Sequence, residues 1–248
     1  MANEALTNAR NELAAAFRLA VRFGLHEGID NHFSLLVPGS DRTFLMNSFG
    51  WHWSEITASS LLVLDMEGRV LAGTGEAEAT AVCIHSRIHR ANPRATCVLH
   101  THMPYATALC MLQNPRLEMA VQSALGFYND VAYDPGYNGL AFDETEGERL
   151  ARALGDKSVL MMGNHGVLVV GKTIPQAFER LYFLERAAQA QVLALSTGRP
   201  LQVIPEAIIK MTVAQFSAGG SVGGRDRAEL HFEALKRVLD RSHSDYAS

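Results

Sequence analysis

The chain has 248 residues, of which 48% are hydrophobic and 19% are charged, and its formal net charge is −4 at pH 7. This composition is typical of a globular protein with a sizeable core, and the lack of a basic block excludes the electrostatic pattern of a nucleic-acid-binding protein. No apolar run is long enough to cross a bilayer, and the first residues, which include Glu4 and Glu12, contain no apolar signal core. We therefore expect a cytoplasmic protein that binds neither nucleic acids nor membranes.

The first part of the chain predicts a helix followed by two hairpins. Apolar residues recur at helical spacing over 4–23, and Gly24 is a suitable stop. Strands at 33–37 and 43–46 flank the turn-forming stretch 38–41, and a second hairpin joins 61–65 to 69–73. A short helix is expected between these hairpins, over 54–61.

The rest of the chain alternates between helices and strands. We expect strands at 95–100, 158–162 and 167–171, with the last two as separate strands or one bent strand, and helices at 78–91, 104–112, 143–155, 175–196 and 226–241. The stretch 116–142 is rich in turns with short strand-like pieces. The pattern predicts a single α/β domain over 1–248, with helices covering a mixed sheet and a helical extension after about residue 217. The three cysteines have apolar neighbours, which favours buried free thiols over disulfides: Cys83, Cys97 and Cys110.

Two histidines at the end of a predicted strand are the sharpest chemical feature. Side chains two residues apart on a strand point to the same side, so His100 and His102 project together. Neutral imidazole is a common ligand of Zn, Mn and Fe. A third histidine, His165, lies between Gly163 and Gly166, which permit a close approach of the backbone. Three histidines predict a metal site that keeps open positions, as catalytic metals require.

Other polar residues near these motifs have more than one interpretation. His85 and His89 have helical i,i+4 spacing, which suits packing or hydrogen bonding around the site, with metal binding as the alternative. Glu76 and Glu78 lie near the start of the same helix, where a glutamate can complete the metal sphere, act as a general base or simply interact favourably with the helix dipole. Aromatic residues upstream fit either an apolar substrate pocket or the core: Phe33, Phe49, Trp51 and Trp53.

The sequence resembles the class II aldolase and adducin family over roughly residues 5–200. The resemblance is carried by NHFSLLVPG, FLMNSFGWHWSEITASSLLVLDMEGRVL, IHSRIHRANPRATCVLHTHMPYATAL and LMMGNHGVLVVGKTIPQAFERLYFLE. It implies a three-layer α/β/α fold around a mixed, largely antiparallel sheet. It also implies a divalent cation, with zinc preferred over manganese or iron, bound by His100, His102 and His165. A homotetramer with the site near a subunit interface is implied as well.

The sequence departs from the family pattern on the substrate side. Phosphate-binding members carry a G-N-x-S-x-R stretch, whereas this chain reads Asp30 to Leu36 there and lacks the arginine. The family's serine pair is also absent, since the corresponding segment reads GTGEAEAT. Arginine suits phosphate through its fixed charge and bidentate geometry, so its loss predicts a non-phosphorylated substrate. The resemblance places Asn31, His32 and Ser34 at the substrate.

The catalytic residues also differ, because Ala81 stands where the family usually has its glutamate. Glu78, one helical turn upstream, and Tyr137 are the residues that we expect to move the proton, with Tyr128 and His32 as alternative suppliers. We expect a metal-dependent aldolase or decarboxylase that cleaves a C–C bond in a small hydroxy-carbonyl or hydroxy-carboxylate substrate through a metal-stabilised enolate. A non-haem iron oxygenase and a non-catalytic adducin-like binding module are the alternatives.

Overall fold

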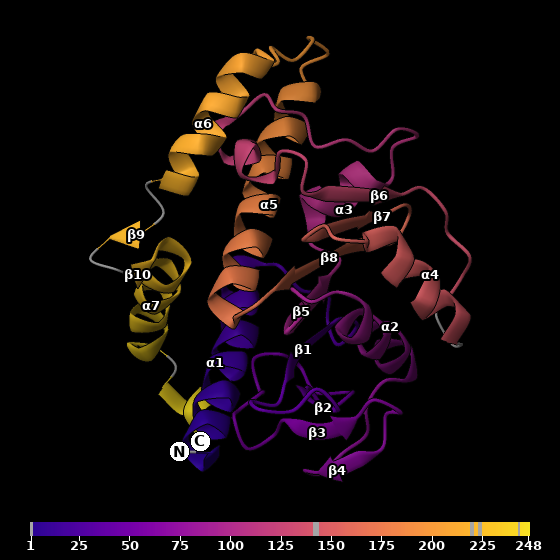
Figure 1. The fold of residues 1–248 in the computed structure, drawn as a ribbon, viewed down its shortest axis with the longest axis vertical. Helices are drawn as coiled ribbons and strands as arrows, with labels where there is room; N and C mark the ends of the chain where they lie inside the picture. Colours follow the sequence, from indigo (N-terminus) through magenta and orange to yellow (C-terminus); the bar gives the residue numbers. More distant parts are fainter. Residues whose placement is uncertain (1, 141–143, 219–220, 223–224, 243) are drawn as a thin grey trace.

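The structure, a computed structural model, describes residues 2–140, 144–218, 221–222, 225–242 and 244–248. An eight-stranded sheet forms its centre (Figure 1), in the spatial order β4 (Val70–Ala72), β3 (Leu62–Asp65), β2 (Thr43–Met46), β1 (His32–Leu36), β5 (Cys97–Thr101), β8 (Gly166–Gly171), β7 (Val159–Met162) and β6 (Val131–Asp134). Only the β6–β7 pair is parallel. The expected mixed, largely antiparallel sheet is therefore confirmed, and β7 and β8 are two strands.

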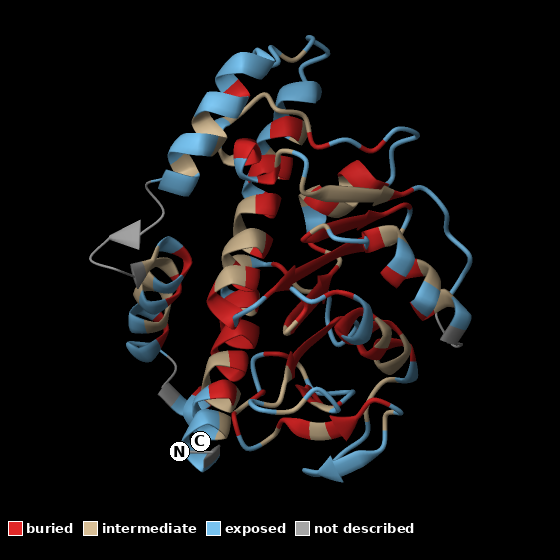
Figure 2. Ribbon diagram, viewed as in Figure 1, coloured by how far each residue is buried: buried red, intermediate tan, exposed pale blue. Residues whose placement is uncertain are grey.

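Helices cover both faces of this sheet and make three layers. One face is covered mainly by α1 (Ala2–Phe23), α3 (Pro104–Cys110), η1 (Gln122–Phe127), α5 (Ile174–Leu195) and α7 (Arg227–Asp240). The other face is covered by α2 (Ala79–Ala91) and α4 (Glu144–Leu154). Buried residues follow the sheet and the inward faces of these helices (Figure 2).

Alternation along the central strands decides which side chains meet which helices. Phe33 and Leu35 of β1 pack in the core beneath α1 and α5. Their neighbours His32 and Ser34 point to the other face, because successive side chains of a strand alternate, and there they contact His85 of α2. A one-residue shift of β1 would exchange the two sets.

Local sequence explains where several elements end. Gly24 follows α1 with a φ of 64°, a left-handed conformation that glycine adopts without steric cost. Asn92 ends α2 with an extended backbone, as expected for the residue before Pro93. Thr173 caps α5 by accepting a hydrogen bond from the Gln176 N–H, and Pro175 occupies the first turn.

Three sequence-based expectations differ from the structure. The helix expected over 54–61 is replaced by turns, because Thr57, Ser59 and Ser60 hydrogen-bond one another and the local backbone. A helix that the sequence did not predict, α6 (Glu206–Ala218), contacts η1 and is exposed over most of its length (Figure 2). Its apolar residues lack a clear one-sided period, which explains why it was missed. Cys83 is only partly buried, whereas Cys97 and Cys110 are fully buried, and none of the three forms a disulfide.

The chain ends lie close together at one end of the molecule (Figure 1), where Arg18 of α1 forms a 3.0 Å ion pair with Asp245 in η2 (Ser244–Ala247). The two-stranded ribbon of β9 (Ser221–Val222) and β10 (Arg225–Asp226) precedes α7. None of the described helices is long and apolar enough to cross a membrane.

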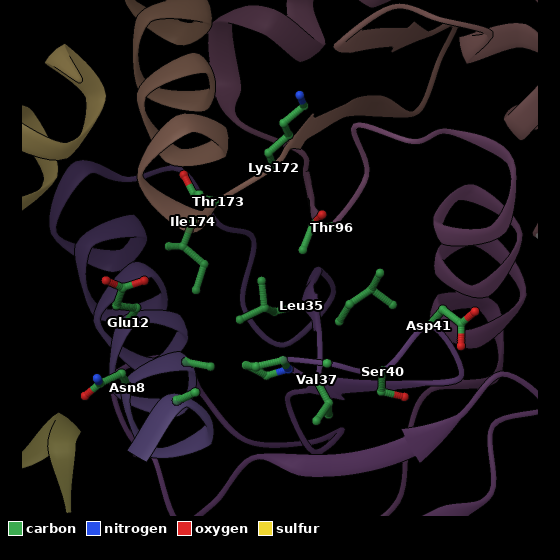
Figure 3. Close-up of a pocket in the computed structure, with 15 residues that line it drawn as sticks. Asn8, Glu12, Leu35, Val37, Ser40, Asp41, Thr96, Lys172, Thr173 and Ile174 are labelled. Atoms are coloured by element: carbon green, nitrogen blue, oxygen red, sulfur yellow. The ribbon is translucent and has the colours of Figure 1, made fainter. Parts of the chain in front are cut away.

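A cavity of about 750 Å³ lies where β1 ends and where β5 begins (Figure 3). Thr96, Lys172 and Glu12 are among the residues that line it. Because β1, β5 and β8 are antiparallel neighbours, this cavity and the residues His32, His100 and His165 lie at opposite ends of the same three strands.

Candidate metal centre

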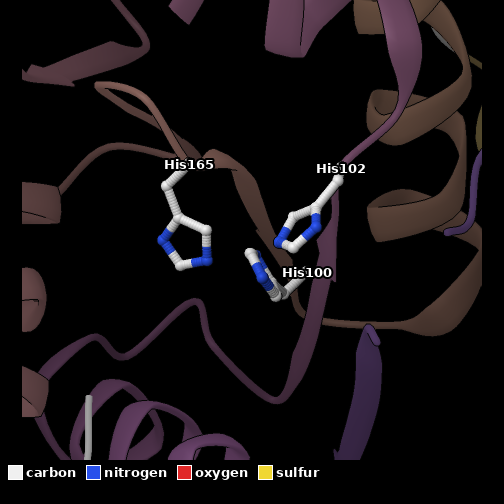
Figure 4. Close-up of side chains that lie close together, drawn as sticks. All are labelled: His100, His102 and His165. Atoms are coloured by element: carbon white, nitrogen blue, oxygen red, sulfur yellow. The ribbon is translucent and has the colours of Figure 1, made fainter. Parts of the chain in front are cut away.

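Three histidines meet where β5 ends and β8 begins (Figure 4). His100 is on β5, His102 follows the end of that strand, and His165 lies in the turn between β7 and β8. Their ring centroids are 4.9 to 5.0 Å apart, and one ligand atom from each lies within 4.8 Å of the others. Three imidazoles at this spacing can hold a divalent cation and leave positions open for a substrate.

Backbone geometry explains how His165 reaches the other two. Asn164 has a φ of 54°, in the left-handed region that asparagine tolerates better than most residues. At Gly166, a Cβ atom would lie 2.7 Å from the His102 ring carbon Cδ2 and 2.7 Å from the Thr101 carbonyl oxygen. The expectation that glycine permits a close approach here is therefore confirmed.

Hydrogen bonds at the Nδ1 atoms fix the orientation of two of these rings. His100 Nδ1 lies 3.0 Å from the Val167 carbonyl oxygen, and His102 Nδ1 lies 2.6 Å from Glu27 Oε2. Since both partners only accept hydrogen bonds, each Nδ1 carries the hydrogen and each Nε2 has a free lone pair. His102 Nε2 is enclosed and has no partner among the described residues. A buried, unpaired imidazole nitrogen facing two further imidazoles fits a bound cation.

Burial favours the neutral form of two of the three rings, His100 and His165. It lowers the pKa of His100 well below its usual value, and the neighbouring His32, His165 and His102 add to the effect. Burial, with His102 nearby, also lowers the pKa of His165 to about 4. Neutral imidazole is the form that binds a metal, so these rings are already in the binding state at pH 7.

The two residues expected to move a proton lie in different surroundings. Tyr137 is 51% exposed, and its ring centroid is 6.4 Å from that of His165. Glu78 is the N-cap of α2, and its carboxylate accepts a 2.5 Å hydrogen bond from Thr80 Oγ1. Of the alternatives, Tyr128 donates its hydroxyl hydrogen to Glu206 at the start of α6 and Glu76 is exposed. Tyr137 is thus beside the histidines, whereas Glu78 is engaged at the helix end.

The three residues expected to bind the substrate also lie in different surroundings. Asn31 is 2% exposed, and its Oδ1 accepts from the N–H groups of Glu27 and His102 at 2.9 and 3.4 Å. Its Nδ2 is buried and has no partner among the described residues. His32 pairs with His100 across β1 and β5, with ring centroids 4.7 Å apart. Ser34 is fully buried and bonds to His85 and His89 instead of facing open space.

Leu36 and the upstream aromatic residues, from which a substrate type was predicted, are not part of the three-histidine cluster. Leu36, where the family pattern has arginine, is four residues along β1 from His32, about 13 Å at 3.3 Å per residue. Phe33 and Trp53 pack against Phe17 in the core, with centroids 4.6 to 4.9 Å apart. Phe33 and Trp53 are therefore core residues, which was one of the two roles predicted for them. Phe49 and Trp51, in contrast, are 45% and 43% exposed.

Two carboxylates that sequence reasoning missed support the three-histidine cluster. Glu27 orients His102, as described above. Glu185 of α5 is buried and accepts hydrogen bonds from the N–H groups of Tyr105 and Ala106, both at 2.9 Å, in the first turn of α3. This contact anchors the segment that immediately follows His102. Neither residue has a sequence signal, because each meets its partner across more than 70 positions of the chain.

Comparison with known proteins gives consistent matches. The family described as Class II Aldolase and Adducin N-terminal domain matches residues 11–192. A protein of Caulobacter vibrioides, named for aldolase class 2, is 37% identical over 99% of this chain and 94% of its own length. Mouse alpha-adducin is 34% identical over 93% of this chain, which spans 33% of the adducin.

Solved structures agree with these matches over nearly the whole chain. An aldolase II superfamily protein from Pseudomonas syringae superposes with a TM-score of 0.90 at 37% identity, covering 98% of this chain and 96% of that protein. An L-fuculose 1-phosphate aldolase from Glaciozyma antarctica superposes with a TM-score of 0.84 at 25% identity, covering 99% and 94%.

Proposed function

This chain belongs to the class II aldolase and adducin family, and we propose that it is a metal-dependent lyase acting on a small molecule. The proposed reaction breaks a C–C bond, by retro-aldol cleavage or decarboxylation, in a non-phosphorylated hydroxy-carbonyl or hydroxy-carboxylate substrate. The observation that carries the proposal is the convergence of three imidazoles, one of which has a buried and unpaired Nε2.

His100, His102 and His165 would hold the cation, and zinc is preferred because neutral nitrogen ligands in a three-histidine set suit it, with manganese and iron as alternatives. When bound, the cation supplies Lewis acidity, which stabilises negative charge that develops on a substrate oxygen. The Glu27 carboxylate holds the His102 ring in place, and the Val167 carbonyl does the same for His100.

Tyr137 is the side chain that we propose to move the proton, because it is exposed and lies beside His165. Glu78 would have to break its hydrogen bond with Thr80 before it could act as a base, so it is the less supported of the two. The unpaired Nδ2 of Asn31 is a donor for a substrate oxygen, since a buried amide hydrogen without a partner is costly.

The charges around the histidines support a substrate without phosphate. Among the described residues, the recorded side-chain contacts of the three histidines include a carboxylate, Glu27, and no guanidinium or ammonium group. Arg149, near the loop that carries Tyr137, is paired with Asp134 at 2.7 Å and with Glu146 at 2.7 Å. Leu36 lies at the far end of β1 from the histidines, so the missing arginine there does not bear on their surroundings.

The test is an activity assay with purified protein loaded separately with zinc, manganese and iron. Candidate substrates are phosphorylated and unphosphorylated hydroxyketones and aromatic hydroxy-carboxylates, and His100→Ala serves as the metal-site control. We expect cleavage of an unphosphorylated compound that is lost in His100→Ala. Preference for the phosphorylated compound would contradict the substrate part of the proposal, and full activity of His100→Ala would contradict the metal part.

A non-catalytic binding module is the second candidate, because mouse alpha-adducin is 34% identical over most of this chain and Ala81 stands where the family usually has its glutamate. Stoichiometric zinc that survives purification and is lost in His100→Ala would count against it. Oxygen consumption by the iron-loaded protein, without lyase activity, would favour the oxygenase alternative.

We also propose that the protein is a cytoplasmic homotetramer with the metal centre near a subunit interface. Three apolar or aromatic side chains close to the cluster in sequence or space are exposed in the single chain: Met111, Leu112 and Tyr137. Such residues suit burial by a neighbouring subunit. Sedimentation analysis tests this, and a monomer would contradict it.

A further inference from the structure

Three buried polar side chains beside the metal centre have no place in the proposed reaction. They are Ser34 of β1 and His85 and His89 of α2, which are 0%, 0% and 8% exposed. Burying a polar group costs free energy unless it is hydrogen-bonded, so a set of three requires a network that satisfies all of them.

The network is a single continuous chain that begins at His32. His32 Nδ1 lies 2.6 Å from His85 Nε2, and His85 Nδ1 lies 2.5 Å from Ser34 Oγ. Ser34 Oγ lies 2.7 Å from His89 Nε2, and His89 Nδ1 lies 2.5 Å from the Ala95 carbonyl oxygen. We call these four side chains, His32, His85, Ser34 and His89, the imidazole chain.

The Ala95 carbonyl sets the direction of every hydrogen bond in the imidazole chain. A carbonyl oxygen only accepts, so His89 Nδ1 carries the hydrogen and His89 Nε2 accepts from the Ser34 hydroxyl. Ser34 Oγ then accepts from His85 Nδ1, and His85 Nε2 accepts from His32 Nδ1. The far end of His32, its Nε2, is consequently left with a lone pair and no hydrogen.

This lone pair lies at the metal centre. The His32 ring lies against that of His100, with centroids 4.7 Å apart and an angle of 35° between the ring planes, and His32 retains 5% exposure. Among the described residues, no group is recorded as hydrogen-bonded to His32 Nε2, and this atom is not one of the enclosed unpaired atoms. Nor is His32 part of the three-histidine set whose ligand atoms lie within 4.8 Å of one another. Its Nε2 therefore reaches open space beside the ligands without being one of them.

We propose that the imidazole chain is a positioning device that holds His32 Nε2 as a hydrogen-bond acceptor for a hydroxyl group of the substrate. This inference rests on the proposed function and narrows its substrate to compounds with an O–H beside the oxygen that the cation binds. His32 accepts a hydrogen bond from the substrate hydroxyl, at a centre where the buried Ala81 replaces the family's usual glutamate.

The imidazole chain cannot act as a proton exit, because it ends on a carbonyl oxygen that gives no proton to solvent. Burial also lowers the pKa of His89 to about 4 and that of His85 well below its usual value, so both rings stay neutral. Its role is therefore to fix the tautomer and direction of His32.

The first test is imidazole ¹⁵N NMR of the metal-free protein, which reports the tautomer of each ring. We expect His32, His85 and His89 all to carry their hydrogen on Nδ1. In Ser34→Ala, His85 and His32 should lose this single tautomer while His89 keeps it, and Ser34→Thr, which retains a hydroxyl, should restore it. Ser158→Ala removes a similarly buried serine just before β7 and should change none of the three. A hydrogen on His32 Nε2 in the wild-type protein would overturn the proposal, whether or not the variants fold.

The second test uses the zinc-loaded protein and two small carboxylates, glycolate and methoxyacetate, which differ in that only glycolate has an O–H. We expect the wild-type protein to bind glycolate about fivefold to tenfold more tightly, as one hydrogen bond allows. The preference should disappear in His32→Phe and Ser34→Ala while zinc affinity stays within about twofold. An unchanged preference in both variants would overturn the proposal. Failure of the wild-type protein to bind zinc, manganese or iron would instead overturn the proposed function, and the tautomers of the metal-free protein would still decide the role of the imidazole chain.

Discussion

Two groups of histidines lie side by side at the centre of this molecule and use their ring nitrogens differently. In the metal centre, Nδ1 of His100 and of His102 is held by an acceptor and the opposite nitrogen is left open. In the imidazole chain, both nitrogens of His85 and of His89 are used by other protein groups. An imidazole with one nitrogen fixed and one open is prepared for a ligand, whereas one with both nitrogens satisfied has a structural role.

The largest effect on zinc affinity should come from removing one of the histidines whose Nε2 is free to bind the cation. His100→Ala is expected to lower zinc affinity by more than ~100-fold, since the loss of a ligand exceeds the 10–100-fold cost of losing an outer partner. Competition with a chromogenic chelator measures it. His231→Ala, on α7, is the control and should bind zinc like the wild-type protein. Equal affinities for both variants would show that His100 is not a ligand.

The next largest effect should be the loss of folding stability on acidification, as His89 of the imidazole chain takes up a proton. The pKa of His89 is about 4 in the folded protein against an ordinary value of 6.5, so the unfolded chain takes up the proton first as the pH falls. The stability that this neutral ring contributes is complete above pH 6.5 and is lost as the pH falls toward 4. The loss through His89 alone is about 3 kcal/mol, at 1.36 kcal/mol per pKa unit.

Urea unfolding of the metal-free protein between pH 7 and pH 4.5 measures this loss. His89→Gln keeps a hydrogen-bonding side chain but does not titrate, so its free energy of unfolding should vary less with pH than that of the wild-type protein. Since His100 and His165 titrate in both proteins, the difference between the two curves isolates His89. Parallel curves would contradict the expected role of burial.

A smaller effect is expected from crowding the metal centre. In Gly166→Ala the new Cβ would meet the His102 ring and the Thr101 carbonyl oxygen at 2.7 Å, so the turn must shift. We expect a loss of about 1–3 kcal/mol in unfolding free energy, together with weaker zinc binding. Gly126→Ala is the matched control, because its Cβ would have no neighbour within 4 Å. Thermal unfolding with and without zinc distinguishes the two variants, and equal behaviour would argue against close packing at Gly166.

The smallest effect should come from the carboxylate that orients His102. Glu27→Gln keeps the length of the side chain but removes its charge, and zinc affinity should fall about tenfold. Glu55→Gln, which alters a carboxylate that accepts from the His52 N–H, is the control. A wild-type zinc affinity in Glu27→Gln would show that the 2.6 Å contact does not support the ligand.

The sequence by itself was sufficient for most elements and for placing His100 and His102 on the same side of one strand. Apolar periodicity predicted α1, α2, α5 and the two hairpins, and the two-residue period of β5 placed His100 and His102 together. These features depend on residues that are close along the chain, where local geometry governs direction. The family resemblance extended the prediction to the largely antiparallel sheet.

Only the tertiary structure decided what surrounds the three histidines. The register of β1 against β5 brings His32 opposite His100, and the packing of α2 on that face brings His85 to Ser34, 51 residues away. The i,i+4 spacing of His85 and His89 puts them on one face of a helix, but it does not show what that face packs against. Packing, hydrogen bonding and metal binding therefore all remained possible from the sequence. The orientation of His102 by Glu27 depends likewise on a contact across 75 residues. Strand register and helix docking are long-range properties, so the sequence indicated which histidines lie together, and the tertiary structure decided which of their ring nitrogens are occupied.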